Sequence, residues 1–439
     1  MNTVNFTLNS TNETHRLAMK LPPSIRQTLS EQEEGVFVTI GKKTERVHLM
    51  EGDSLTVEVN EAFVHTFCLP CPLTLQWHYD KDNHTVIFGP FLAIWTECVG
   101  NVDSPSFAGM EPFLEECTSF GADHGVGVFV LPTSLPPSSE WQGFYWTETG
   151  IQTAKFPSPH VVYNRIHRRS YEASPQFALW TERFTEEGIL SFNPSFFSKT
   201  EVQSHLETQS DTRYLLPATV AWDKKAVLNW VRSHKSFFLK PENGSQGKGI
   251  VVCSSTTEGL RIERTHPAKV KILSLENTNE EIWTELSSYI KGNALVQETI
   301  SFRTVQASPV DFRYILHRRN NEWRMTSSVA RIGQPGGTVS NVARGGTMAR
   351  TKSVLDLWYD PRTAKDMEKQ LAKTVRKLAA PFSEWECYEL GLDVGIDEDN
   401  RIWLIEVNSK PSKKWTHAEK AIRPSTKQLI FQTLDAFLE

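Results

Sequence analysis

A chain of 439 residues is too long for one ordinary hydrophobic core, and its length predicts roughly two or three domains. Hydrophobic residues make up 39% of it and charged residues 23%, as is typical of soluble globular proteins. A net charge of −5 excludes the basic character of most nucleic-acid-binding domains, and the short basic cluster at 165–169 is of a kind that usually forms a solvated face. No run of about 18 apolar residues predicts a membrane span, and the N-terminus lacks a signal-peptide pattern. We therefore expect a cytoplasmic protein without a nucleic-acid partner.

The first 88 residues are dominated by short β-type segments bounded by Gly, Asp or Asn. These segments are 35–41, 46–50, 54–59, 73–79 and 84–89. No convincing helical pattern interrupts them, so the sequence predicts an all-β module over 1–88. Cys68 and Cys71 form one CxxC without a second ligand pair, and structural or incidental cysteines are favoured over a redox or zinc site.

Residues 89–190 alternate strand-like and helix-like segments. The strands are expected at 90–97, 125–132 and 160–166, and the helices at 106–121, where Gly121 would end the first, and 177–188. This alternation predicts a small α/β domain with parallel strands. The remainder, 191–439, contains two further amphipathic helices, at 224–234 and 366–382. The second places Met367, Leu371, Val375 and Leu378 on one face.

A glycine-rich hairpin is predicted at SFFLKPENGSQGKGIVVCSS. Gly244, Gly247 and Gly249 allow backbone N–H groups to approach an anion closely, and Lys240 and Lys248 add positive charge. A Walker A loop is excluded because Gly249 follows the lysine and no helix follows the turn. A dinucleotide fingerprint also needs a helix, and the kinase motifs that accompany a kinase glycine loop are absent. An ordinary glycine turn stays open as the alternative.

A second hairpin, YELGLDVGIDEDNRIWLIEVNSKP, carries oxygen ligands. Glu406 and Asn408 are two residues apart and so share one strand face. A two-residue turn at 399–400 would pair Asp393 with Glu406 and would place Gly391 opposite Asn408, and a slip of one residue would turn Asp393 away. Such a set suits Mg²⁺. A solvated polar face is the alternative, which the apolar run IWLIEV around Glu406 disfavours.

Together these motifs resemble the ATP-grasp superfamily, and most closely its YheC/YheD type, which is linked to the endospore coat. The matching segments run in family order from about residue 195 to 412: YLLP, FFLKPENGSQGKGI, LVQETI, PVDFR, VARIG, SNVARGGT and GLDVGIDEDNRIWLIEVNSKP. PFLAIWTE, FPSPHVVYNRIHRR and FNPSFFSKTEV resemble its upstream part. The resemblance implies an α+β protein: the all-β module, a pre-ATP-grasp α/β domain at 89–190, and an ATP-grasp domain at 191–439 with a lid at about 215–296.

The resemblance also implies roles for individual residues. Nucleotide contacts are expected from Lys199, Lys240, the phosphate lid with Gly244, Ser245, Gly247, Lys248 and Gly249, and the adenine hinge with Gln297, Glu298 and Ile300. Catalytic roles on the transferring phosphate or the active-site wall are expected from Arg313, Arg331, Asn341 and Arg344. The magnesium ligands would be Asp393, Glu406 and Asn408. The chain departs from the family in having Ser198-Lys199-Thr200 where DKW is more usual.

The activity implied is that of an ATP-dependent carboxylate–amine or carboxylate–thiol ligase acting through an acyl phosphate. ATP and Mg²⁺, with Mn²⁺ as an alternative, would be its cofactors, and its partner would be a carboxylate-bearing small molecule or peptide. A spore-coat or envelope connection is implied by the same resemblance. The alternative is a non-catalytic coat or assembly protein that retains an ATP-binding shell, and fold alone does not separate the two. Phosphotransfer to another kind of acceptor would use the same machinery.

Overall fold

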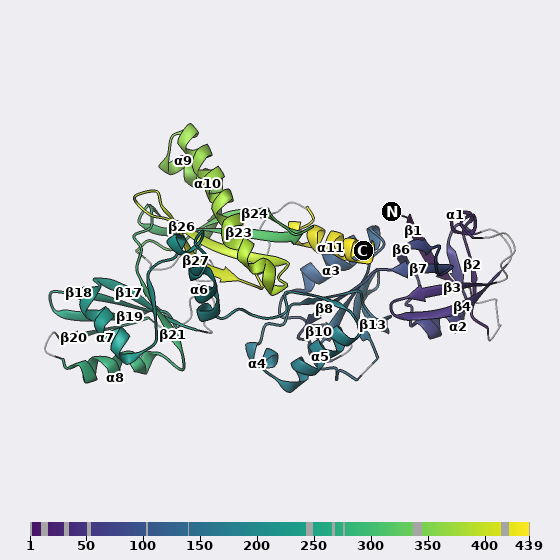
Figure 1. Cartoon of the computed structure of the whole chain (residues 1–439), viewed down its shortest axis with the longest axis horizontal. Coiled ribbons are helices and arrows are strands. Elements are labelled where there is room, and N and C mark those ends of the chain that lie inside the picture. The colour runs from purple at the N-terminus through teal and green to yellow at the C-terminus, as the bar shows by residue number, and fades with distance from the viewer. Residues whose placement is uncertain are drawn as a thin grey trace. The chain divides into compact units, whose positions relative to one another are not determined.

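The computed structural model describes residues 2–9, 16–29, 35–50, 54–101, 104–138, 140–242, 249–265, 268–274, 277–336, 345–413 and 421–438. The chain forms two compact units, one of Met1–Ser195 with Ser412–Glu439 and the other of Phe196–Pro411 (Figure 1). Within the described ranges, no helix has both the length and the apolar character needed to cross a membrane. The domain boundaries expected from sequence stay predictions. The expected ATP-grasp domain extended to residue 439, whereas in the structure the segment Ser412–Glu439 belongs to the N-terminal unit.

The N-terminal part of the first unit is a closed barrel in the order β1-β5-β2-β4-β3-β7-β6. Its strands are β1 (Asn2–Leu8), β2 (Ala18–Lys20), β3 (Gly35–Ile40), β4 (Lys43–Leu49), β5 (Val57–Val59), β6 (Leu73–Asp80) and β7 (Thr85–Gly89). The five expected strands are confirmed. The purely β content is wrong, because α1 (Pro23–Arg26) and α2 (Glu61–Phe67) are helical. In α2, Asn60 caps the N-terminus and Phe63 and Phe67 are buried in the core.

The second part of this unit is a six-stranded sheet in the order β13-β12-β11-β8-β14-β15. Its elements are β8 (Phe91–Thr96), α3 (Glu111–Asp123), β11 (Gly127–Pro132), β12 (Gln142–Thr147), β13 (Gly150–Lys155), β14 (Val161–Asn164), α4 (Arg169–Glu172), α5 (Pro175–Glu186) and β15 (Leu190–Phe192). A small pair, β9 (Val99–Asn101) and β10 (Ser104–Ser106), lies apart from the sheet, and α11 (Pro424–Leu438) packs on α3.

The expected parallel arrangement is confirmed for β8, β11 and β14, and β15, which the sequence analysis did not predict, adds a further parallel strand. The expected end of the first helix at Gly121 is wrong, since α3 continues to Asp123. A Cβ on Gly121 would lie 2.6 Å from a Val128 methyl carbon, so this glycine permits close helix–sheet packing rather than ending the helix.

The second unit contains two sheets. The central sheet is antiparallel in the order β25-β24-β23-β26-β27, with β22 paired to β23. Its elements are α6 (Lys199–Glu207), the 3-10 helix η1 (Arg213–Leu215), β22 (Thr304–Val305), β23 (Ser308–Arg319), β24 (Glu322–Ile332), β25 (Thr347–Ala349), α9 (Thr351–Trp358), α10 (Pro361–Ala379), the 3-10 helix η3 (Ala380–Trp385), β26 (Glu389–Ile396) and β27 (Ile402–Asn408). The predicted apolar stripe of α10 is buried and packs in one core with Phe312, Leu392 and Leu404.

The second sheet of this unit, called the lid sheet below, has the order β16-β21-β17-β18-β19-β20. Its elements are β16 (Thr219–Ala221), α7 (Lys224–Ser233), β17 (Ser236–Pro241), β18 (Val251–Thr256), β19 (Gly259–Thr265), β20 (Ala268–Ser274), α8 (Asn279–Tyr289) and β21 (Ala294–Glu298). The antiparallel pairing of β17 with β18 confirms the hairpin predicted around the glycine motif.

Candidate functional site

The carboxylate hairpin consists of β26 and β27. Asp393 pairs with Glu406 and Gly391 with Asn408, as predicted. The predicted two-residue turn is wrong, however: Ile396 pairs with Ile402, and the Asp397 N–H bonds the Arg401 carbonyl across a three-residue loop, 398–400. Asn400 closes this loop in the left-handed region, at φ 65°. The longer loop displaces the register by one residue, and a second irregularity restores it.

That irregularity is a β-bulge at Ile405, which has no partner between the Val394–Leu404 and Asp393–Glu406 pairs. A bulge reverses the alternation of the strand it interrupts. Ile402 and Leu404 therefore point into the apolar core, whereas Glu406 and Asn408 point to the opposite face of the sheet together with Asp393. The bulge explains how an acidic residue follows directly on a buried apolar run without facing the core.

Two arginines converge on Asp393. Arg313, on the neighbouring β23, donates from Nε and Nη2 to the two Asp393 oxygens, each at 2.7 Å. Arg331, on β24, donates from Nη2 to Asp393 Oδ2 at 2.8 Å and also forms a two-bond pair with Asp311 at 2.5 and 2.7 Å. Asp393 and Asp311 are almost fully buried, at 2% and 4% exposure, so this network compensates charges that would otherwise be costly.

The network fixes the ionisation of its members. Burial opposes the charged form of Asp393, but Arg313 and Arg331 outweigh it and lower the pKa of this carboxyl group. Burial likewise disfavours the charge on Arg331, yet Asp393 and Asp311 raise its pKa. The sequence analysis did not single out Asp311. A signal was present, because it precedes Arg313 by two residues within PVDFR and so shares its strand face.

A second ion pair joins Lys199 to the same face. Lys199 Nζ lies 3.2 Å from Glu406 Oε1. The lysine is the first residue of α6, and Ser198 caps this helix through a capping box with Glu201. The unusual serine therefore fixes the helix start and, with it, the position of Lys199. The Phe197 N–H also bonds Ser409 Oγ at 3.3 Å, which ties the start of α6 to the end of β27.

Lys240 extends from β17 of the lid sheet to Gln297 on β21, where its ammonium donates to the amide oxygen. Gln297 in turn donates to Thr219 Oγ1 at 3.1 Å. Burial lowers the pKa of Lys240 to about 8; Glu406 opposes this shift and Lys199 adds to it. No ion pair of Lys240 occurs among the described residues, so its charge is the least compensated of the candidate site.

Of the other predicted site residues, the structure describes Glu298, Ile300 and Gly249 but not the rest. The Glu298 carboxylate accepts the Ala218 N–H at 2.7 Å and its own N–H donates to the Ala218 carbonyl, so Glu298 joins β21 to the segment before β16. Ile300 lies two residues after the end of β21, and Gly249, with φ 76°, lies two residues before the start of β18. The remaining predicted residues lie outside the described ranges: Gly244, Ser245, Gly247, Lys248, Asn341 and Arg344.

The oxygen set on β26 and β27 fits a hard divalent cation. Asn408 Nδ2 is buried and has no hydrogen-bond partner among the described residues, so a phosphate oxygen could accept from it, while its Oδ1 is the atom that a cation would use. Asp393 receives three hydrogen bonds, which leaves about one of its four lone-pair positions, and Glu406 is contacted among the described residues by Lys199 alone. Within the described part of the chain, no group of three His, Cys, Asp or Glu side chains is placed to hold a metal. A metal here would therefore use two carboxylates, Asn408 and phosphate oxygens.

A family model described as YheC/D like ATP-grasp matches residues 188–433. The chain belongs to this family. Its ATP-grasp region therefore includes both sheets of the second unit, and the α+β ATP-grasp architecture expected from the motifs is confirmed. The chain is 26% identical over 413 residues to the endospore coat-associated protein YheD of Bacillus subtilis (strain 168), with 90% of this chain and 87% of that protein covered.

The endospore coat-associated protein YheC of the same organism is 23% identical over 281 residues, covering 61% of this chain and 74% of that protein. Among solved structures, the VanG D-Ala:D-Ser ligase from Enterococcus faecalis aligns with a TM-score of 0.48 and 12% identity. That alignment covers 80% of this chain and 99% of the ligase.

Proposed function

We propose that the chain is an ATP-dependent ligase that activates a carboxylate and joins it to an amine or thiol. The observation that carries the proposal is the row of charges on one face of the central sheet. Asp393 and Glu406 are paired across the hairpin, three cationic side chains reach them, and Asn408 on the same face has a buried Nδ2 group without a hydrogen-bond partner in the described chain. A cluster of this kind is suited to hold a metal and a polyphosphate together.

Each residue has a separate role in this proposal. Lys240 and Lys199 attract the phosphates of ATP, while Gln297, Glu298 and Ile300 border the base. Asp393, Glu406 and Asn408 would hold Mg²⁺, or Mn²⁺ in its place, and the bound ion would polarise phosphate oxygens. Arg313 and Arg331 stabilise the charge of the transferring phosphoryl group.

The two arginines are not equivalent. Arg331 has two carboxylate partners and would keep Asp311 if Asp393 turned to a metal, whereas in the described part of the chain the Arg313 guanidinium hydrogen-bonds Asp393 alone. Arg313 is therefore the guanidinium that a metal on Asp393 would release toward substrate. Asp311 acts as a positioning residue, because it holds Arg331 in place.

The proposed reaction has two steps. An oxygen of the substrate carboxylate attacks the γ-phosphorus of ATP, the bond from this phosphorus to the β–γ bridging oxygen breaks, and ADP leaves with the electron pair. The acyl phosphate is then attacked at its carbonyl carbon by an amine or thiol, and inorganic phosphate leaves as the nucleophile gives its proton to solvent. Because phosphoryl transfer depends mainly on positioning and charge, the chain needs no nucleophilic side chain for the first step.

A coat-related substrate, such as a peptide or envelope component, is proposed because the relatives YheD and YheC are described as endospore coat-associated proteins. The same names favour the alternative of a non-catalytic coat protein that binds ATP. The two functions differ in one measurable result, because the alternative predicts ATP binding without ADP release when carboxylates and amines are supplied. Phosphotransfer to another acceptor would give a phosphorylated product without a ligated one.

The test compares the wild type with Glu406→Gln. ADP release is measured with pools of carboxylates and amines, with and without Mg²⁺, and mass spectrometry identifies products that need protein, ATP and cell extract. We expect ADP release that requires Mg²⁺ and falls by roughly 100-fold in Glu406→Gln, the scale of losing one electrostatic contact to a transition state.

Glu322→Gln is the matched control, because Glu322 is an exposed carboxylate on β24 whose one ion pair among the described residues is with the exposed Arg324. The same loss in both variants would show that the effect is unspecific. ADP release that depends on neither Glu406 nor Mg²⁺ would reject the catalytic proposal.

A further inference from the structure

Buried polar residues in the α/β sheet of the first unit all lie at one edge. Among the described residues from 90 to 193, each buried polar or charged side chain belongs to the last residue of a parallel strand or to the residue directly after it. They are Thr96, Glu97, Thr133, Asn164, Arg165 and Asn193. Because β8, β11, β14 and β15 are parallel, all six gather at the carboxyl edge of the sheet.

This edge is also where the chain changes direction across the sheet. From the central strand β8 the chain passes to β11 on one side and later to β14 on the other. In open α/β sheets, the crevice outside such a switch point is the usual place for a ligand. Buried polar groups at the same place are what a ligand site, rather than a packed core, requires.

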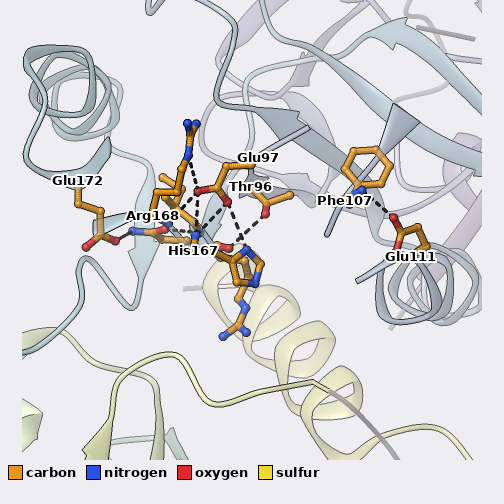
Figure 2. Close-up of polar contacts among 10 residues, drawn as sticks. Thr96, Glu97, Phe107, Glu111, His167, Arg168 and Glu172 are labelled. Atoms are coloured by element: carbon orange, nitrogen blue, oxygen red, sulfur yellow. Dashed lines mark hydrogen bonds and ion pairs between the residues drawn. The ribbon is translucent and has the colours of Figure 1, made fainter. Parts of the chain in front are cut away.

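Glu97 organises the loop that follows β14. Its carboxylate accepts the backbone N–H of His167 at 2.9 and 3.0 Å and that of Arg168 at 2.9 Å (Figure 2). Burial opposes the charge on Glu97, but the bonds from His167 and Arg168 lower its pKa to about 2. Thr96 adds a bond from its hydroxyl to the Arg165 carbonyl at 3.2 Å. The loop is thus held by its backbone.

The side chains of this loop are engaged only in part. Arg168 Nε lies 3.4 Å and His167 Nδ1 3.2 Å from the Glu97 carboxylate, yet the Arg168 side chain is 63% exposed and that of His167 is 43% exposed. At the same edge, the Arg165 guanidinium and the Lys413 ammonium each lie 5.6 Å from the centre of the Tyr163 ring. A cluster that the sequence pattern assigned to a solvated face therefore contains a buried arginine and a clamped loop.

The charges at this edge favour an anion. Arg165, Arg168 and Lys413 bring three positive charges, against two carboxylates, Glu97 and Glu172, that already bond the loop and Asn164. Loop anchoring alone would explain Glu97, because its bonds go mainly to backbone N–H groups, and it also uses Arg168 Nε, which lies 3.4 Å from Glu97. It does not use the two terminal nitrogens of the exposed Arg168 guanidinium, which make no hydrogen bond within the described part of the chain, and this difference allows a test.

We propose that the carboxyl edge of this sheet is a binding site for an anionic molecule bearing carboxylate or phosphate groups. Arg168 contacts the anion, and Glu97 is a positioning residue that holds the 165–168 loop. The proposal is independent of the proposed ligase activity, because it concerns the first unit and is tested without nucleotide.

The test is calorimetric titration of the full chain with tri-glutamate and, separately, with inorganic phosphate, using tri-lysine as the cationic comparison. We expect saturable binding of at least one of the two anions and none of tri-lysine, with an affinity that falls as salt is added. Arg168→Ala should weaken binding by about tenfold or more, the scale of a lost charge-assisted contact, while the backbone bonds to Glu97 remain. Tri-glutamate and phosphate distinguish the two kinds of anion.

Arg46→Ala is the matched control, since Arg46 is an exposed arginine on β4 of the same unit. Glu97→Gln should weaken binding with Arg168 still present, and its melting temperature reports separately whether the unit stays folded. Failure of both anions to bind saturably would overturn the proposal. An equal loss in Arg168→Ala and Arg46→Ala would overturn it as well.

Discussion

The two sheets of the second unit treat buried charge in opposite ways. In the central sheet, Asp393 and Asp311 are surrounded by arginines, so the charges are compensated within the fold. In the lid sheet, Lys240 bonds an amide, Gln297, and burial lowers its pKa to about 8. The first arrangement stabilises the folded chain without a ligand, whereas the second leaves a cation that an incoming anion would stabilise. We infer that the central sheet is pre-organised and that the lid sheet is the part that responds to ligand.

The largest effect is expected from Asp393→Asn. The change removes a buried charge that two arginines share, and breaking a buried pair of this kind costs about 3–5 kcal/mol. The free energy of unfolding, measured with denaturant, should fall by that amount without any ligand present. A fall below about 1 kcal/mol would contradict the view that the central sheet is stabilised by its own charges. Glu322→Gln serves again as the exposed control.

Lys240→Met should give the opposite result. Removing a buried cation without a carboxylate partner in the described chain should leave the free energy of unfolding unchanged or raise it. ADP affinity should fall by roughly 10- to 100-fold, as expected from losing a hydrogen bond from a charged group, worth about 1.5–3 kcal/mol. Lys225→Met, on the exposed side of α7, should change neither quantity. A large loss of stability in Lys240→Met would show that the fold also compensates the charge of Lys240, and the two sheets would then not differ.

The pH dependence sharpens the same contrast. Lys240 loses its proton near pH 8 in the folded chain and near its ordinary value of 10.5 in the unfolded chain. Between these values the unfolded state binds more protons, so the contribution of Lys240 to stability rises with pH. ADP affinity should fall over the same range as the lysine becomes neutral. Lys240→Arg, which stays charged, should show a flat affinity from pH 7 to about 10; a parallel fall in both proteins would refute the assignment.

The smallest effect is expected from removing either of two similar helix caps. Ser198 caps α6 in the site and Thr278 caps α8 on the lid sheet, each through a capping box. Ser198→Ala and Thr278→Ala should each cost about 1 kcal/mol of stability. Only Ser198→Ala should also weaken ADP binding, because it frees the start of the helix that carries Lys199. Equal ADP affinities in both variants would mean that the cap does not position this lysine.

Local patterns predicted the parts of the fold that depend on spacing along the chain. The two-residue period placed Glu406 and Asn408 on one face, and the helical period identified the buried face of α10. Asp311 was missed because its role depends on Arg331, which lies on another strand 20 residues away. The helix α2 was missed because its seven residues are too few for a periodic signal, and its stability comes from a cap and two buried phenylalanines.

The Asp393–Glu406 pairing was predicted correctly from a turn that the chain does not have. A loop one residue longer and a bulge at Ile405 cancel each other at this pair. The basic cluster at 165–169 shows the reverse case. Its composition is that of a solvated face, but a carboxylate 70 residues earlier in the chain binds its backbone. Neither a bulge nor a long-range backbone contact has a signature in composition.

The bulge at Ile405 has a consequence for how relatives are aligned and how the hairpin can be altered. Because Val394 pairs with Leu404 and Asp393 with Glu406, a chain without Ile405 would place Glu406 directly after Leu404 and still opposite Asp393. A loop of another length that keeps the Ile396–Ile402 pair would likewise leave every later pair in place. Position 405 and the loop at 398–400 are therefore the places where a relative could gain or lose one residue and keep its acidic side chain on the face of Asp393.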